Sequence, residues 1–223
     1  MSYRLKLLAL LICATATLVL LNTGYSALNT KSRLDVVEAE RDQWQRPTEI
    51  VQALAIKPGD TVVEIGCGSG YFSLKLSSAV GKRGQVYAED IRRLPLVFLW
   101  FRKILKNDPN IRVVHGEEGN PHLGTQPVNE ALIANTYHEL TDPQAMLAYV
   151  RQALISGGRL VVVDRAPNST RRDEDPLAEH EIPAERVESE LRAAKFEITA
   201  REDDFIGRDA DNENWWLIVA RKP

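Results

Sequence analysis

The chain has 223 residues, of which 44% are hydrophobic and 26% are charged, and its formal net charge is −3. These values are ordinary for a globular domain, and they exclude an intrinsically disordered chain, a polytopic membrane protein and a broadly basic protein that coats nucleic acid. The two cysteines, Cys13 and Cys67, are too few for a disulfide framework or a cysteine-based zinc site. The cysteines therefore imply no metal.

The first residues have the order that is typical of an export signal. Arg4 and Lys6 precede an almost wholly apolar stretch, residues 7–21, and small and polar residues follow it. This stretch is shorter than the roughly 20 residues that span a bilayer, so a cleaved signal peptide over residues 1–27 is the leading interpretation. An uncleaved signal anchor is the alternative. Cys13 lies inside the run behind a bulky residue, which argues against lipidation.

Helical spacing of apolar residues begins again after the export-like segment. Between Ser32 and Leu54 this spacing is interrupted by Pro47, which predicts two helical pieces with a joint. A turn at residues 57–60 ends the second piece. We therefore expect an N-terminal helical lead-in over residues 28–60, followed by a single domain over residues 61–223.

From residue 61 onward, short apolar runs alternate with segments of helical spacing. The predicted strands are 61–65, 85–88, 111–114, 131–134, 160–163, 196–199 and 215–220, and the predicted helices are 71–80, 95–105, 143–154 and 183–195. Continuous apolar runs indicate strands that helices cover on both faces, so the fold class is α/β with a doubly wound sheet. The charged stretch 168–179 is predicted to be a solvated loop.

Three glycines, Gly66, Gly68 and Gly70, occupy alternate positions between a predicted strand and a predicted helix. Glycines let the backbone approach a ligand closely, and the helix that follows offers unpaired N–H groups to an acceptor-rich ligand. A dinucleotide fingerprint would need its third glycine at Tyr71, which argues against a nicotinamide-dependent oxidoreductase. Cys67 has no basic neighbour in sequence to lower its pKa, so we interpret it as a small space-filling residue.

This glycine loop, preceded by Glu64, resembles motif I of the class I S-adenosylmethionine-dependent methyltransferases. Further matches to that family follow in order at residues 86–91, 135–140, 142–143 and 157–164, and the lead-in 41–47 is like that of small, often exported bacterial methyltransferases. The resemblance covers roughly residues 40 to 220. It implies a Rossmann-like, seven-stranded, mostly parallel sheet whose last strand is antiparallel, and S-adenosyl-L-methionine as the cofactor.

The resemblance also implies roles for individual cofactor-binding residues. The loop of Gly66, Cys67, Gly68 and Gly70 would face the methionine part of the cofactor, and Glu64 would reach its ammonium group. Asp90, with Glu89 beside it, would accept hydrogen bonds from the ribose hydroxyls, a task that suits a carboxylate because it has several lone pairs. Glu117 would contact the adenine amino group.

Other interpretations of these residues stay open. Asp90 could instead cap the N-terminus of the next helix, and Glu117 could form a solvated loop pair with Glu118. Asn135 stands where many relatives have Asp, so a charge near the sulfonium is absent although a hydrogen-bonding side chain is kept. This departure puts full catalytic competence in question.

The candidate catalytic residues are Tyr137 and His138, which follow the fourth predicted strand where ligands bind in such folds. Methyl transfer needs a general base only when the acceptor must lose a proton, and His138 suits that role because its ordinary pKa is ~6.5. Alternatively, His138 holds its loop by a hydrogen bond. His180 borders the expected acceptor pocket or lies in a solvated loop. His115 and His122 have no metal-like partners at suitable spacing, so no metal site is expected.

Two functions from different classes compete. The leading hypothesis is a methyltransferase acting on a small-molecule acceptor, without nucleic acid, as a monomer or homodimer. The alternative is a catalytically inactive scaffold protein of the cell envelope, which Asn135 and the export-like segment motivate because the cofactor is made in the cytoplasm. The positive residues before the apolar run predict a cell-envelope or periplasmic location, with the N-terminal segment touching or spanning the membrane. A cytoplasmic location is the alternative.

Overall fold

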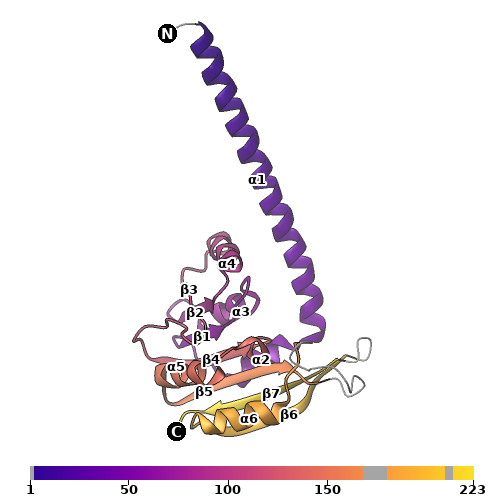
Figure 1. The fold of residues 1–223 in the computed structure, drawn as a ribbon, viewed down its shortest axis with the longest axis vertical. Helices are drawn as coiled ribbons and strands as arrows, with labels where there is room; N and C mark the ends of the chain where they lie inside the picture. The colour runs from indigo at the N-terminus through magenta and orange to yellow at the C-terminus, as the bar shows by residue number, and fades with distance from the viewer. Residues whose placement is uncertain (1–2, 168–179, 209–212) are drawn as a thin grey trace. The chain divides into compact units, whose positions relative to one another are not determined.

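The computed structural model describes residues 3–167, 180–208 and 213–223 (Figure 1). The predicted solvated loop at residues 168–179 lies outside these residues. The chain divides into two units, Met1–Gln45 and Arg46–Pro223. Each unit is described by itself below.

The first unit is one continuous helix, α1 (Tyr3–Trp44). It carries the apolar stretch into the predicted lead-in without a break, and the hydroxyl of Thr17 donates to the carbonyl of Cys13 at 2.8 Å. Within the described residues, no helix combines the length and apolarity that a membrane crossing requires. The signal peptide or anchor stays a prediction. The joint predicted at Pro47 is confirmed, since α1 ends before it and α2 (Pro47–Ala53) begins there.

The second unit is built on one seven-stranded sheet with the order β3-β2-β1-β4-β5-β7-β6. Strands β1 to β5 run parallel, whereas β7 pairs antiparallel with both β5 and β6. The expected mostly parallel sheet with an antiparallel last strand is therefore confirmed. The strands are β1 (Thr61–Ile65), β2 (Gln85–Asp90), β3 (Ile111–His115), β4 (Val128–Ala134), β5 (Leu154–Arg165), β6 (Glu197–Arg208) and β7 (Glu213–Arg221).

Helices flank this sheet, as Figure 1 shows. They are α3 (Tyr71–Val80), α4 (Arg93–Lys106), η1 (Tyr137–Glu139), α5 (Pro143–Ala153) and α6 (Ala184–Ala193). Helix α3 has the predicted bounds, because three glycines mark its start and Gly81 ends it. Strands β5 and β6 are both longer than predicted, because glycines and charged residues separate apolar residues such as Leu154 and Phe205 from the continuous apolar runs.

One part of the core lies between the sheet and helices α5 and α6. The predicted apolar face of α5 is buried at Met146, Leu147 and Val150, where it joins strand residues of β1, β4, β5 and β7. Trp215 and Trp216 are both buried, and the indole N–H of Trp216 donates to the carbonyl of Ile182 at 2.8 Å. In the structure, residues at both faces of β7 are covered.

The order of the strands fixes the place of the site. The chain leaves β1 toward β2 on one side and reaches β4 on the other, so the strand order reverses beside β1. In open α/β sheets ligands bind outside the carboxyl ends of the strands at such a switch point. The carboxyl ends of β1, β2 and β4 lead to the glycine loop, to Asp90 and to η1, respectively.

Candidate functional site

The loop between β1 and α3 depends on its glycines. Gly66, Gly68 and Gly70 have φ values of 71°, 53° and 89°, a region that side chains with a Cβ rarely adopt. A Cβ on Gly66 would also collide with Thr136, and one on Gly70 would collide with Leu99. The loop conformation therefore needs glycine at all three positions, and close packing also requires it at Gly66 and Gly70.

Asp90 ends β2 and holds the glycine loop. Its side chain is only 2% exposed, and Oδ2 accepts a hydrogen bond from the backbone N–H of Gly68 at 2.9 Å. Oδ1 accepts from the backbone N–H of Arg92 at 2.8 Å, and the Arg92 guanidinium lies 3.2 Å from the same oxygen. This ion pair raises the pKa of Arg92. The N-cap of α4 is Arg92, so the alternative of Asp90 as that cap is wrong.

A small cavity of about 90 Å³ opens beside Asp90. Its walls come from the ends of β1 and β2, the loop after β3, η1 and the start of α5. Side chains with a carboxyl group dominate the lining: Glu89, Asp90, Glu117, Glu118, Glu139 and Asp142. Among the described residues, the lining has one basic side chain, that of Arg92. Such a wall favours a ligand that donates hydrogen bonds or carries positive charge, as S-adenosyl-L-methionine does.

Glu89 is an acceptor in this wall that the protein leaves partly unsatisfied. Its side chain is 1% exposed, and Oε2 lies 3.5 Å from the backbone N–H of Gly66. Oε1 is buried and has no hydrogen-bond partner among the described residues. Burial, with the nearby charge of Asp90, raises the pKa of Glu89 to about 7. A buried acceptor of this kind fits a donor-rich cofactor, because an unmade hydrogen bond is costly.

His138 on η1 is oriented by a buried acid. Its Nδ1 lies 2.8 Å from Oδ1 of Asp164, which is fully buried at the end of β5. An ionised carboxylate can only accept, so Nδ1 carries the proton and Nε2 is left as an acceptor. Nε2 lies 3.8 Å from Oε1 of Glu139, and Glu139 lines the cavity. The side chain of His138 is only 2% exposed and does not itself line the cavity, so Glu139 is the residue that joins the imidazole to the cavity wall.

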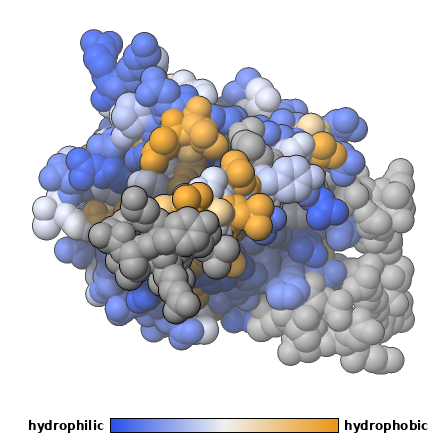
Figure 2. All heavy atoms as spheres, turned by 90° about the horizontal axis from the view of Figure 1, so that it is seen from above, coloured by the Kyte–Doolittle hydropathy of each residue, from blue (hydrophilic) through white to orange (hydrophobic). Residues whose placement is uncertain are grey.

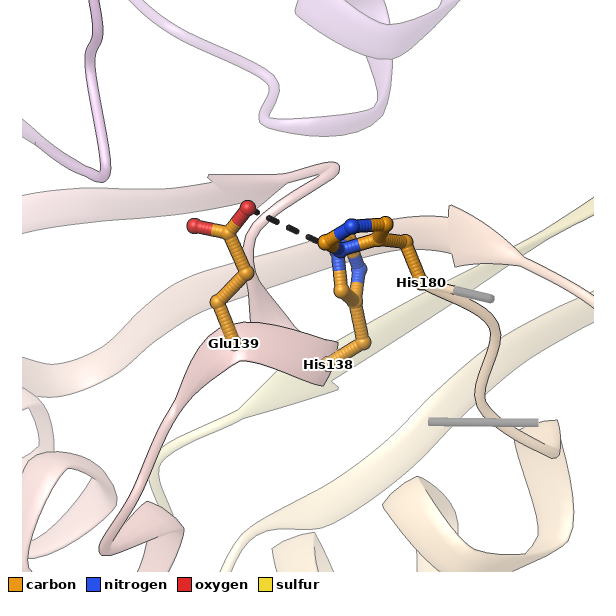
Figure 3. Close-up of side chains that lie close together, drawn as sticks. All are labelled: His138, Glu139 and His180. Atoms are coloured by element: carbon orange, nitrogen blue, oxygen red, sulfur yellow. Dashed lines mark ion pairs between the residues drawn. The ribbon is translucent and has the colours of Figure 1, made fainter. Parts of the chain in front are cut away.

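His180 completes this cluster, as Figure 3 shows. Its ring centroid lies 5.2 Å from that of His138, and its backbone has a φ of 59°. One ligand atom from each of His138, Glu139 and His180 lies within 4.8 Å of the others. Two imidazoles and a carboxylate are a set that binds divalent transition metals. The expectation of no metal site is thus still a prediction. Nε2 of His138 could act as a base or as a metal ligand, but not as both at once.

Tyr137, the other candidate catalytic residue, points elsewhere. It is 1% exposed, and its hydroxyl donates to Oε2 of Glu190 on α6 at 2.7 Å. Burial, together with this hydrogen bond, raises the pKa of Tyr137. Tyr137 does not line the cavity. Its hydroxyl ties η1 to α6, so we expect it to position the loop that carries His138.

The remaining candidates lie under or beside the glycine loop. Glu64 is buried, and its Oε2 accepts from the hydroxyl of Ser73 at 2.5 Å. Asn135 has a φ of 55°, and its Oδ1 accepts from Nε of Arg165 at 3.2 Å. Burial raises the pKa of the Cys67 thiol, which agrees with a space-filling role. None of the three candidates lines the cavity itself, whereas Glu117 does.

The sequence analysis did not select Asp164 or Glu139 as site residues. Asp164 had a signal, because it ends the apolar run 160–163 and so reaches the same sheet edge as His138. Glu139 had a weaker one, since it merely follows His138 in the chain. The contacts of Asp164 and Glu139 with His138 depend on the direction in which η1 leaves β4. The sequence pattern does not predict this direction.

Comparison with known proteins agrees with this geometry. A model of the ubiE/COQ5 methyltransferase family matches residues 25–172, which is more than half of the chain. The chain belongs to this family. The resemblance predicted from the motifs is confirmed: the chain belongs to a family of S-adenosylmethionine-dependent methyltransferases, whose cofactor is S-adenosyl-L-methionine.

The chain spans about half the length of the curated relatives that it matches. It is 30% identical over 124 residues to the ubiquinone/menaquinone biosynthesis C-methyltransferase UbiE of Shewanella frigidimarina, covering 54% of this chain and 48% of that protein. It is 29% identical over 122 residues to the protein-L-isoaspartate O-methyltransferase of Ignicoccus hospitalis, covering 53% of this chain and 54% of that protein. The acceptors named for these relatives differ.

Solved structures share the fold. A SAM-dependent methyltransferase from Aquifex aeolicus superposes with a TM-score of 0.67 at 24% identity, covering 78% of this chain and 88% of that one. Geranyl diphosphate C-methyltransferase from Streptomyces coelicolor, solved with S-adenosyl-L-homocysteine, gives a TM-score of 0.66 at 13% identity, covering 80% of each chain.

Replacement of Tyr137 by phenylalanine tests the positioning role of its hydroxyl. We expect Tyr137→Phe to lower the free energy of unfolding by ~1–2 kcal/mol, because Glu190 loses its hydrogen-bond donor. We expect methyl transfer to persist at a temperature where the variant is folded. Denaturant unfolding and turnover measure the two effects, and a loss of turnover without a loss of stability would make the hydroxyl catalytic.

The raised pKa of Glu89 makes cofactor affinity depend on pH. Glu89 is largely protonated in the ligand-free protein below about pH 7 and ionised above it. A cationic ligand favours the ionised form, so S-adenosyl-L-methionine should bind several-fold more tightly at pH 7.5 than at pH 6, with ~pH 7 as the midpoint. Calorimetric titration at the two pH values measures this difference.

The control for this pH effect is a second buried glutamate. Burial and the nearby Asp60 raise the pKa of Glu130 to about 8, but Glu130 pairs with Val62 at the opposite end of the sheet. We expect Glu89→Gln to flatten the pH dependence of affinity and Glu130→Gln to leave it unchanged. Equal affinities of the unmodified protein at both pH values would contradict the role of Glu89.

Proposed function

We propose that the protein transfers a methyl group from S-adenosyl-L-methionine to a small-molecule acceptor bound over His138. The observation that carries this proposal is that the carboxylate-rich cavity around Asp90 lies next to the buried pair of His138 and Asp164. Glu139 belongs to both, because it lines the cavity and lies 3.8 Å from Nε2 of His138.

The chemistry of the surroundings supports a small acceptor. Relatives include enzymes named for quinone precursors, for isoaspartyl residues of proteins and for tRNA adenines. An RNA acceptor would call for a basic surface around the cavity, whereas carboxylates dominate this wall and the chain has a net charge of −3. A small molecule that fits beside the cofactor meets no such electrostatic barrier.

The cofactor site would work by shape and charge. Asp90 supplies carboxylate lone pairs to ligand hydroxyls, and the guanidinium of Arg92 lies 3.2 Å from its Oδ1. The glycine loop lets backbone N–H groups come close to the ligand. When bound, the cofactor supplies an electrophilic methyl carbon on a positively charged sulfur. The surrounding carboxylates favour that cation over neutral competitors.

The acceptor side would be handled by His138. Nε2 takes the proton that the acceptor loses as its new bond to carbon forms, and Asp164 stabilises the resulting imidazolium through Nδ1–H. Because Asp164 is fully buried, this attraction is screened little by solvent. His180 and Glu139 flank Nε2 and limit where the acceptor can lie (Figure 3).

Thermal unfolding tests the cofactor site without knowledge of the acceptor. S-adenosyl-L-methionine or S-adenosyl-L-homocysteine at about a hundred times its dissociation constant should stabilise the protein by ~2.7 kcal/mol, or roughly 5–10 °C. We expect Asp90→Asn to lose most of this shift, while Asp203→Asn, on the exposed part of β6, keeps it. An unmodified protein that folds but shows no shift with either ligand would favour the scaffold function.

Replacement of His138 tests the acceptor side. With an acceptor found in a panel of phenols, thiols and amines, we expect His138→Asn to lower turnover by about 10²–10⁴-fold and to leave the ligand-induced thermal shift intact. The matched control is His122→Asn, at an exposed histidine outside the cavity. Unchanged turnover in His138→Asn would remove this residue from the mechanism.

The same assay distinguishes a base from a metal ligand. We expect turnover of the unmodified protein to survive dialysis against a chelator, because a base at Nε2 needs no ion. Turnover that a chelator abolishes and Zn²⁺ restores would instead assign His138, Glu139 and His180 to a metal centre.

A further inference from the structure

Helix α4 turns an apolar face outward. Six large apolar side chains on this helix are each 49–70% exposed, and we call them the outer face of α4: Leu94, Val97, Trp100, Phe101, Ile104 and Leu105. Figure 2 colours the residues of both units by hydropathy, and hydrophobic side chains appear in it among hydrophilic ones. A helix on the surface of a domain ordinarily presents polar residues to solvent, so this arrangement is inverted.

The inner face of α4 explains why the helix cannot hide these side chains. Arg102 is 4% exposed, and its Nη1 donates to the carbonyl of Ser69 in the glycine loop at 2.7 Å. Leu99 is fully buried where a Cβ on Gly70 would collide with it. The side of α4 that faces the domain is therefore committed to the cofactor loop, and the apolar residues are left on the other side.

The charged residues within helix α4 itself all have one sign. Between Ile91 and Asn107 the sequence contains five arginines and lysines, at positions 92, 93, 102, 103 and 106, and no aspartate or glutamate. Arg93 and Lys106 are exposed at the first and last residues of the helix. Trp, Phe and Leu on one face together with basic residues at both ends are typical of helices that lie in the interface of a lipid bilayer.

We propose that the outer face of α4 binds the surface of an anionic lipid bilayer. The apolar side chains would enter the boundary between headgroups and acyl chains, and Arg93 and Lys106 would meet the negative headgroups. A second copy of the chain fits less well, because both ends of α4 are basic. A two-fold pairing of this face with itself brings like charges together in either helix orientation.

The position of α4 relates this surface to the cofactor cavity. Ile91 and Arg92 line the cavity and directly precede the helix, and Ile91 is itself 47% exposed. A bilayer bound at the outer face would therefore lie next to that wall of the cavity. The lipid-binding proposal does not depend on the acceptor or on methyl transfer, so the two proposals can fail separately.

Vesicle binding by the full-length chain tests the proposal. We expect binding to vesicles that contain about 30% phosphatidylglycerol to weaken tenfold or more in Phe101→Gln/Ile104→Gln, because two apolar anchors are lost. The matched control is Tyr149→Gln/Ile155→Gln, which changes two apolar residues that are 42% and 39% exposed outside the outer face. The control should bind as the unmodified protein does. Helix α1 is the same in all of these proteins, so the difference reports on α4.

Two further measurements locate the contact. Arg93→Gln/Lys106→Gln should weaken binding to the anionic vesicles by roughly fivefold per charge and change binding to phosphatidylcholine vesicles little. The fluorescence of Trp100 is obtained as the difference between the emission of the unmodified protein and that of Trp100→Phe. We expect this difference to shift to shorter wavelength with anionic vesicles and to be quenched by brominated lipids. This signal reports on the outer face alone.

If something other than a bilayer covers the outer face, the same experiments give different results, and each of these would overturn the proposal. Equal vesicle binding by all variants, with no quenching of Trp100, would assign membrane contact to another segment. If Phe101→Gln/Ile104→Gln instead converts a self-associated protein into a monomer and leaves vesicle binding unchanged, the face binds a second copy. Trp100 emission that is already at short wavelength without lipid, and insensitive to it, would mean that the chain itself covers the face.

Discussion

The carboxylate of Asp90 is the group on which the geometry of the site depends. Through one oxygen it fixes the glycine loop at Gly68, and through the other it fixes the backbone of Arg92 just before α4. A charge that is 98% buried is tolerated only when hydrogen bonds and an opposite charge compensate for its lost hydration, and both are present here. One acid thus sets the cavity wall, the loop that borders it and the start of the next helix.

Parallel topology concentrates further acids at the same edge. Glu89 ends β2 beside Asp90, and Asp164 ends β5, so three buried carboxyl groups lie at the carboxyl ends of strands. Their compensation differs: Asp164 accepts from the imidazole of His138, whereas Glu89 keeps a buried oxygen without a partner in the described part of the chain and has a pKa raised to about 7. The edge is therefore built for a ligand that brings donors or positive charge.

The sequence predicted those features that a local pattern encodes. Alternate glycines and helical spacing located α3 without error, and the apolar runs located every strand of the sheet. The added ends of β5 and β6 were missed because glycines and charged residues interrupt their apolar residues. The contact of His138 with His180, and that of Tyr137 with Glu190, join segments that are distant in sequence. These contacts depend on how η1 and α6 pack, which spacing does not specify.

In helix α4, contacts with the cofactor loop fix which face of the helix points outward, but they do not fix whether the residues on that face are polar or apolar. Rotation of the helix about its axis by one residue position, about 100°, would be needed to turn Phe101 inward. The same rotation would withdraw Arg102 from the carbonyl of Ser69 and Leu99 from its contact beside Gly70. A polar sequence on the outer positions would have satisfied the loop equally well. The apolar outer face is thus not a by-product of loop support, and this separation makes a binding role for that face the simpler explanation.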